Sequence, residues 1–218
     1  MSERYVVKRL DEIAGYADPS KAQWFPIRAD FGIAAFGVNA WRSGEAGQEL
    51  IGEHDELGDD STGHEELYVV LSGRAGFTVD GVQVEAPAGT LVFVRDPATK
   101  RAAVAAEDAT TVLVVGARSG EAFTPSGWEA SAEALRYWTT KEYGKAIELL
   151  ATRHEEQPEN ATVVYNLACA ESLDGRVGDA LAHLERAIEL RPSFREAAQT
   201  DTDFDAIRAD PRFPAAAG

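Results

Sequence analysis

The chain has 218 residues, of which 44% are hydrophobic and 27% are charged, a composition typical of a folded globular protein with one large domain or two small ones. Its formal net charge is −16, and 19 acidic against 11 basic residues up to Gly120 leave −8 on each side of that position, so neither half offers the basic surface that nucleic acid or an anionic membrane face requires. No apolar run approaches the ~20 residues of a membrane span, and the N-terminal stretch lacks the apolar core of a signal peptide, so we expect a cytoplasmic protein.

Residues 31–117 alternate between apolar and polar side chains in short stretches that turn residues separate. In "EELYVVLSG", for example, Glu66, Tyr68 and Val70 share one face of a predicted strand, and the residues between them point to the other face. Short strands with turn signals every 8–12 residues predict an all-β sandwich or small barrel. The predicted strands are two within 31–54, one each in 65–73 and 75–80, two within 82–94 and two within 101–117.

From residue 127 onward the apolar residues recur at the three- and four-residue spacing of helices. We predict helices around 131–138, 142–154, 162–173 and 177–190, and the proline and glycine of "EAFTPSG" mark the junction before them. The sequence therefore predicts a β domain over 1–118 with an N-terminal extension, a linker over 119–126 and an all-α domain over 127–218. Cys169, the only cysteine, lies in this helical pattern, which favours a packed thiol over a nucleophile.

The helical half repeats itself at one constant offset. Four pairs of matching residues share this offset: Gly144 with Gly178, Ala146 with Ala180, Leu150 with Leu184, and Pro158 with Pro192. Because the offset equals the tetratricopeptide repeat length of about 34 residues, 127–194 are similar to that family, and 194–214 look like a capping helix pair. The resemblance implies a surface for protein contact on the first helix of each unit, with Trp128, Trp138 and Tyr165 as the candidates. These side chains would equally suit packing on the β domain.

Two stretches of the β half resemble the motifs of the cupin family, over about residues 30–116. Six residues separate Glu66 from Gly73, as at the end of the first cupin motif, and Pro87-Ala88-Gly89 in "APAGTLVFVRDP" matches the opening of the second motif. The resemblance implies a small barrel of the jelly-roll type, whose mouth binds a divalent metal, a small ligand or nothing. It also implies a homodimer.

At the positions where this resemblance places the metal ligands, the chain has other residues. A His–x–His pair belongs three or four residues before Glu66, where 59–62 contain no histidine. His54 and Glu56 take those places only if 57–63 are an insertion, and the alternative metal site would consist of His54, Glu56, His64 and Glu66. The final histidine of the second motif falls on Lys100 or Arg101, and a guanidinium group cannot ligate a metal and repels a divalent ion.

We therefore expect a metal-free barrel without a cofactor, which binds a small ligand or serves as a scaffold and carries the helical arm for contact with a protein partner. Arg101 would pair with Glu66 or with a small anion. The predicted ligand-binding residues are Glu66, Tyr68, Phe77, Phe93, Lys100 and Arg101. The alternative is a divalent-metal-dependent cupin enzyme of the dioxygenase, isomerase or decarboxylase type, and the fold alone chooses none of these activities.

Overall fold

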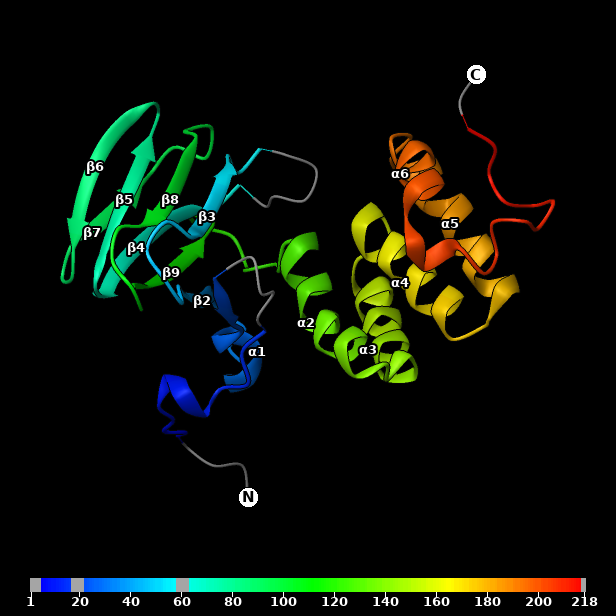
Figure 1. Cartoon of the computed structure of the whole chain (residues 1–218), viewed down its shortest axis with the longest axis horizontal. Helices are drawn as coiled ribbons and strands as arrows, with labels where there is room; N and C mark the ends of the chain where they lie inside the picture. Colours follow the sequence, from blue (N-terminus) through cyan, green and yellow to red (C-terminus); the bar gives the residue numbers. More distant parts are fainter. Residues whose placement is uncertain (1–4, 17–21, 58–62, 217–218) are drawn as a thin grey trace. The chain divides into compact units, whose positions relative to one another are not determined.

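The alternating stretches of the first half form antiparallel strands in the computed structural model, which describes residues 5–16, 22–57 and 63–216 (Figure 1). Its contacts divide the chain into two units, Met1–Thr124 and Pro125–Gly218, and the boundary falls inside the stretch 119–126. The strands of the described residues are β1 Gln23–Phe25, β2 Gly37–Arg42, β3 Glu49–His54, β4 Glu65–Ser72, β5 Arg74–Val79, β6 Val82–Pro87, β7 Leu91–Val94, β8 Arg101–Ala105 and β9 Thr111–Ala117.

Two sheets make up the β unit, in the strand orders β1-β2-β9-β4-β7 and β3-β8-β5-β6. All the pairings are antiparallel, so the predicted all-β fold is confirmed at this level. One core joins side chains of both sheets, with Tyr68 and Val70 from β4 and Phe77 from β5. The predicted alternation along β4 is thus correct, and Glu66 faces the same side as these two β4 core residues.

The turn between β4 and β5 depends on Gly73. Its φ of +68° lies in the left-handed region, and a Cβ atom there would meet Thr110 Oγ1 at 2.5 Å and Thr110 Cα at 2.8 Å. Only glycine adopts this conformation beside a neighbouring backbone without strain. The glycine that matches the first cupin motif therefore has a physical role in this chain.

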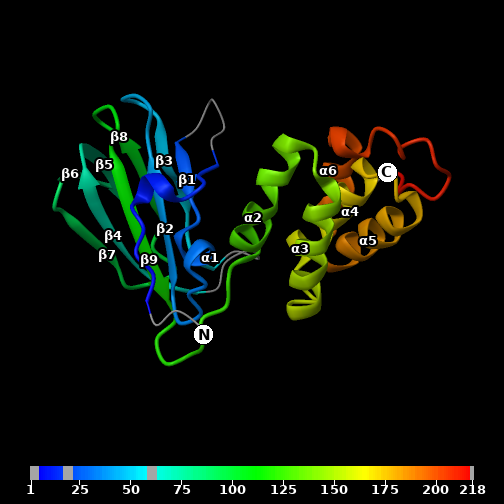
Figure 2. The ribbon, with the colours of Figure 1, turned by 90° about the horizontal axis from the view of Figure 1, so that it is seen from below.

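The described part of the N-terminal segment packs on one face of the first sheet, over β2 and β9. It contains the 3-10 turn Leu10–Glu12 and the short helix α1 Ile27–Phe31, which lies beside β2 (Figure 2). Ile13 and Phe25 bury themselves there against Ala40 of β2. These elements leave little sign in the sequence, because stretches of three to five residues are too short to show a period.

The second unit consists of helices, and each of the four predicted helical stretches lies within one of them or overlaps it closely. Ser126 caps the helix that begins at Gly127 by accepting a hydrogen bond from the backbone N–H of Glu129. Asn160 caps the helix that begins at Ala161 by accepting one from the backbone N–H of Val163. None of the helices in the described part of the chain is long and apolar enough to cross a bilayer. The helices are α2 Gly127–Thr140, α3 Tyr143–Glu156, α4 Ala161–Leu173, α5 Val177–Leu190 and α6 Phe194–Thr200, followed by the 3-10 turn η2 Thr202–Phe204.

The structure places Trp138 and Tyr165 against the C-terminal segment of their own unit. Trp138 Nε1 donates to Asp203 Oδ2 at 3.1 Å and the Tyr165 hydroxyl donates to Asp201 Oδ2 at 2.9 Å, while the ring of Phe204 is fully buried beside Tyr165. Both side chains thus have hydrogen-bond partners within their own unit, and their predicted role in contact with a partner or with the β unit stays a prediction. The segment after α6 folds back and satisfies both polar groups.

Cys169 is buried close to the same segment, as the sequence predicts for a packed thiol. Burial raises its pKa, and the charge of the nearby Asp201 adds to this effect. A thiol that stays protonated at neutral pH is a poor nucleophile. Trp128 differs from the other two predicted contact residues because 46% of its surface is exposed.

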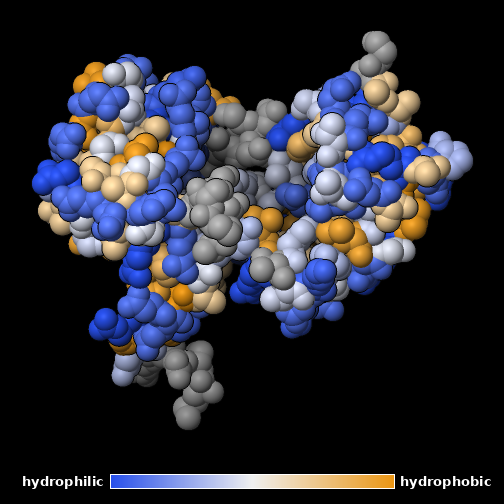
Figure 3. All heavy atoms as spheres, viewed as in Figure 1, coloured by the Kyte–Doolittle hydropathy of each residue, from blue (hydrophilic) through white to orange (hydrophobic). Residues whose placement is uncertain are grey.

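Hydrophilic residues cover most of the visible surface of both units, and the hydrophobic residues there form small separate groups (Figure 3). This agrees with the net charge of −16. Such a charge keeps copies of the chain apart in solution unless an uncharged surface brings them together.

Candidate functional site

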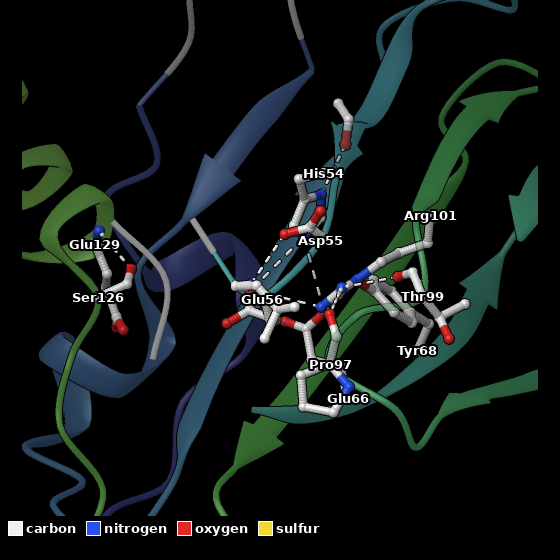
Figure 4. Close-up of polar contacts among 12 residues, drawn as sticks. His54, Asp55, Glu56, Glu66, Tyr68, Pro97, Thr99, Arg101, Ser126 and Glu129 are labelled. Atoms are coloured by element: carbon white, nitrogen blue, oxygen red, sulfur yellow. Dashed lines mark hydrogen bonds and ion pairs between the residues drawn. The ribbon is translucent and has the colours of Figure 1, made fainter. Parts of the chain in front are cut away.

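Arg101, at the start of β8, points inward and only 1% of it is exposed. Its guanidinium group binds Glu66 Oε2 through Nη2 at 2.6 Å and through Nε at 3.1 Å (Figure 4). Nε also lies 3.2 Å from the Tyr68 hydroxyl oxygen, and Nη1 donates to the backbone carbonyl of Thr99 at 3.1 Å. A buried cation thus has the carboxylate and polar partners that its burial requires.

The strand register explains why these residues meet. Arg101 lies opposite His54 in the β3–β8 ladder, while Glu66 and Tyr68 lie two residues apart on the inward face of β4. β8, which carries Arg101, and β4, which carries Glu66, belong to different sheets. The Arg101–Glu66 ion pair therefore connects the two sheets through the interior. The sequence expectation that Arg101 pairs with Glu66 agrees with these distances.

His54 and Glu56 complete this arrangement at the end of β3. His54 Nε2 lies 3.8 Å from Glu56 Oε1 and 3.9 Å from Glu66 Oε2, and Glu56 Oε1 lies 3.5 Å from Arg101 Nη2. Since His54 Nδ1 donates to the Gly52 carbonyl at 2.8 Å, its Nε2 faces the carboxylates. We refer to His54, Glu56, Glu66, Tyr68 and Arg101 as the ion-pair cluster.

The protonation states within the ion-pair cluster follow from burial and from its charges. Burial raises the pKa of Tyr68 well above its usual value, and the negative charge of Glu66 adds to the shift, so the phenol keeps its proton and donates a hydrogen bond to Glu66. Burial opposes the charge on Arg101, but Tyr68 and Glu66 outweigh it and raise the pKa of the guanidinium. With neutral His54, the formal charge of the cluster is −1.

Three side chains of this cluster also form a group that could hold a metal ion. One ligand atom from each of His54, Glu56 and Glu66 lies within 4.8 Å of the other two, and imidazole and carboxylate both ligate divalent ions. However, Arg101 Nη2 already lies 2.6 Å from Glu66 Oε2 and 3.5 Å from Glu56 Oε1. A metal on these same oxygens does not fit while Arg101 keeps this position.

The other predicted site residues lie apart from the cluster, with one exception. Phe77 is the exception, since it is buried with its ring edge-on to Tyr68 at 5.5 Å. Phe93 does not line the interior, because its phase along β7 turns it outward and leaves it 48% exposed. Lys100 also points away, with 64% of its side chain exposed and Nζ 3.9 Å from Glu53 Oε1.

His64 is likewise separate from the group of metal-ligand candidates. It is buried just before β4, where its ring stacks on Phe123 with centroids 5.1 Å apart. Burial lowers its pKa, although Glu66 acts in the opposite direction. Residues 58–62, most of the insertion that the sequence suggests as an alternative, lie outside the described residues.

A pocket of about 300 Å³ adjoins the ion-pair cluster. Glu56 belongs to both, and Arg118 Nη1 is paired with Glu121 Oε2 at 2.9 Å on another part of the pocket wall. Sequence patterns do not reveal this site, because most of residues 118–124 fall in the predicted linker. The lining residues are Glu56, Leu57, Gly63, His64, Arg118, Glu121, Ala122 and Thr124.

Among solved structures, the chain is similar to several small β proteins. It is 22% identical to a cupin protein from Bacteroides fragilis, with a TM-score of 0.42 over 56% of this chain and 92% of that one. A predicted oxalate decarboxylase from Thermotoga maritima gives 18% identity and a TM-score of 0.42, over 51% of this chain and 97% of that one. A protein with a double-stranded β-helix domain from Klebsiella pneumoniae gives 17% and 0.42, over 57% and 98%.

No model of a known protein family matches the sequence, and no curated protein matches it either. The architecture stated above rests on the strand order and register of the β unit. The cupin resemblance rests on the motifs around Glu66, Gly73 and Pro87.

Proposed function

We propose that the β unit is a metal-free cupin-type barrel that binds a small polar molecule without catalysing a reaction. One observation carries this proposal: the guanidinium group of Arg101 binds the carboxylate oxygen that a divalent ion would need. Its charge stands where the resemblance places the last histidine ligand. The cluster then acts as a structural connection between the sheets.

Electrostatics support a metal-free barrel. A divalent ion bound to Glu66 Oε2 at about 2.1 Å would lie within about 5 Å of Arg101 Nη2, since that nitrogen is 2.6 Å from the same oxygen. At an effective dielectric constant of about 20, a double and a single positive charge at this distance repel by roughly 7 kcal/mol. The carboxylates of Glu66 and Glu56 and the imidazole of His54 would have to offset that repulsion.

The pocket beside Glu56 is the proposed ligand site. Its volume of about 300 Å³ is at the lower end of the range for small-molecule sites. Carboxylates and a guanidinium group line it, so it suits a molecule with both hydrogen-bond donors and acceptors. Because Arg101 is already paired and the cluster carries a formal charge of −1, we favour a hydroxylated or amine-bearing ligand over the small anion expected from the sequence.

A thermal-shift screen of sugars, small amines and small carboxylic acids tests the ligand site. We expect stabilising compounds among the first two classes, with the stabilisation lost in Glu56→Gln and kept in Lys100→Gln, whose side chain is exposed away from the pocket. Hits that are carboxylates and depend on Lys100, or hits that ignore Glu56, would contradict the proposed site.

A second candidate is the metal-dependent enzyme, which the convergence of His54, Glu56 and Glu66 within 4.8 Å favours. It requires Arg101 to leave these oxygens, and a bound divalent ion would then supply Lewis-acid chemistry. Elemental analysis of untagged protein, combined with melting in the presence of a chelator, distinguishes the two candidates. Stoichiometric metal that is lost in His54→Gln would make the enzyme the better account.

We also propose that the helical unit is a pair of tetratricopeptide repeats that contacts a protein. The helices α2 and α4 begin at Gly127 and Ala161, and α3 and α5 begin at Tyr143 and Val177. Both pairs of helix starts are thus offset by the repeat length of about 34 residues. Trp128 is the candidate contact residue, since Trp138 and Tyr165 pack on the C-terminal segment. A partner that binds wild type and Trp128→Ala equally would exclude that residue.

A homodimer through the β unit is the last part of the proposal. Leu71 of β4 and Leu91 and Phe93 of β7 are exposed apolar side chains, and β7 is an edge strand. Uncharged strand edges promote association. In sedimentation velocity we expect a dimer for wild type and a monomer for Phe93→Glu, and a monomeric wild type would contradict the proposal.

A further inference from the structure

The face of the first sheet that points away from the core is covered at one end and open at the other. Leu113 of β9 packs under the N-terminal segment, whereas Leu91 and Phe93 of β7 are 63% and 48% exposed. Leu113 and Leu91 share this face because both lie opposite Val69 of β4, and Phe93 follows two residues after Leu91. The open end thus presents apolar side chains to solvent.

The backbone of β7 is open at the same place. β7 is the last strand in the order of its sheet and pairs with β4. The N–H of Val70 donates to the carbonyl of Thr90 at 3.0 Å, and in an antiparallel ladder every second residue bonds to the same neighbour. Val92 therefore also bonds toward β4, and the N–H and C=O groups of Leu91 and Phe93 point to the sheet edge. Such an edge is a template for a further strand.

Residues Tyr5–Val7, which we call the N-terminal arm, have the complementary property. Their side chains are 79%, 47% and 82% exposed in chain order. They belong to no helix or strand, and they make no backbone–backbone hydrogen bond to another described residue. Tyrosine and valine favour strands, and an extended segment gains both backbone bonds and apolar contacts when it adds to a sheet edge.

The spacing of the arm matches the spacing of the edge. In an antiparallel pairing, two edge residues that are two positions apart bond to two arm residues that are also two positions apart. Tyr5 and Val7, the most exposed side chains of the arm, would pair with Phe93 and Leu91. Paired side chains lie on the same face of a sheet, so the arm would cover the open apolar end.

Connectivity and charge favour the edge of a second copy over the edge of the same chain. In its own chain the arm leads into the turn Leu10–Glu12 beside β2, and β9 and β4 separate β2 from β7. Lys8 and Arg9 follow the arm, while the stretch up to Gly120 carries a net charge of −8. Opposite charges therefore draw the basic end of the arm to the β unit of another copy.

We propose that the N-terminal arm of one copy adds as a strand to β7 of a second copy, and that the exchange is mutual. A two-fold arrangement closes both open edges with the same contact. The proposal rests on the homodimer proposed above and names the segment that holds it together. The partner of the open face is thus a second copy of this chain, recognised by backbone pairing and apolar contact.

Sedimentation velocity of the full chain tests the proposal with a double variant, Tyr5→Asp with Val7→Asp. Both side chains are exposed, so the fold should remain intact. We expect dimerisation to weaken by about tenfold or more, because the new carboxylates would be buried without partners. The matched control is Val82→Asp, on the exposed face of β6 at the edge of the other sheet, which should dimerise like wild type.

Hydrogen exchange adds a readout at the edge itself. The amides of Leu91 and Phe93 should exchange more slowly in dimeric wild type and in Val82→Asp than in the arm variant. A dimer that persists in the arm variant but is lost in Phe93→Glu would overturn the arm exchange and leave the homodimer standing, whereas a monomeric wild type would overturn both. Slow exchange of these amides in monomeric wild type that is lost in the arm variant would place the arm on its own sheet and contradict the exchange.

Discussion

Replacing Arg101 with methionine is the perturbation whose effect follows most directly from the structure. Methionine keeps much of the length of the side chain but removes its charge and its hydrogen bonds to Glu66, Tyr68 and Thr99. The carboxylate of Glu66 then stays largely buried without its cation. Removing one partner of a buried ion pair costs about 3–5 kcal/mol, and we expect a loss in this range for the β unit.

Hydrogen exchange measured peptide by peptide is the suitable assay, because two units need not unfold in one transition. The free energy of opening for β4 and β8 should fall by about 3–5 kcal/mol in Arg101→Met, while the α4 peptides of the second unit stay unchanged. Lys100→Met is the matched control, and its exposed, 3.9 Å pair with Glu53 should be worth less than about 1 kcal/mol.

A double-mutant cycle then separates the ion pair from general damage to the core. Arg101→Met combined with Glu66→Gln removes both charges. The free energy of unfolding lost in the double variant should therefore be smaller than the sum of the two single losses by about 2–3 kcal/mol. Equal losses in Arg101→Met and Lys100→Met, or strictly additive losses in the cycle, would refute the interpretation of Arg101 as a buried, paired cation.

Three further changes give predictions of known sign. Gly73→Ala should destabilise the β unit by about 2–4 kcal/mol, because this position has a positive φ and a Cβ atom would clash with Thr110. Gly81 has a positive φ but open space around it, so Gly81→Ala should cost only about 1–2 kcal/mol. Equal melting temperatures of the two variants would contradict this. Burial lowers the pKa of His64, so the neutral imidazole contributes to the free energy of unfolding above the unfolded-state pKa of about 6.5, and this contribution is lost as the pH falls. In urea titrations, wild type should therefore lose more stability than His64→Leu between pH 7 and 5. Ala180→Leu should cost about 1–3 kcal/mol in helix stability measured by circular dichroism, since Ala180 is fully buried; an unchanged midpoint would show that the helices can separate at little cost.

The sequence predicts the β4 strand and its inward face because alternation over eight residues has one consistent phase. Glu66, Tyr68 and Val70 therefore fall on one face by arithmetic alone, and the burial of Tyr68 and Val70 shows that this face is the interior one. The choice between Lys100 and Arg101 depends on a one-residue gap, and a shift of one residue moves a side chain to the opposite face of a strand. The structure places Arg101 opposite His54 in the β3–β8 register with its side chain buried, and it leaves the Lys100 side chain exposed.

Contacts between residues far apart in the chain cannot be predicted from the sequence for a different reason. Phe93 fits a strand pattern equally well on either face, and burial rather than periodicity shows that it points outward. The sequence predicts Trp138 and Tyr165 as contact residues, but their hydrogen-bond partners are Asp203 and Asp201, which lie far along the chain in the C-terminal segment. No local pattern encodes such a contact.

The most direct measurement of the central claim is metal binding to wild type and to Arg101→His, each tested with and without His54→Gln. If Arg101 takes the place of a metal ligand, wild type binds no divalent ion at a site that requires His54. Arg101→His should then bind about one equivalent of metal, and adding His54→Gln should abolish that binding. Stoichiometric, His54-dependent metal in wild type, with no gain in Arg101→His, would contradict the account.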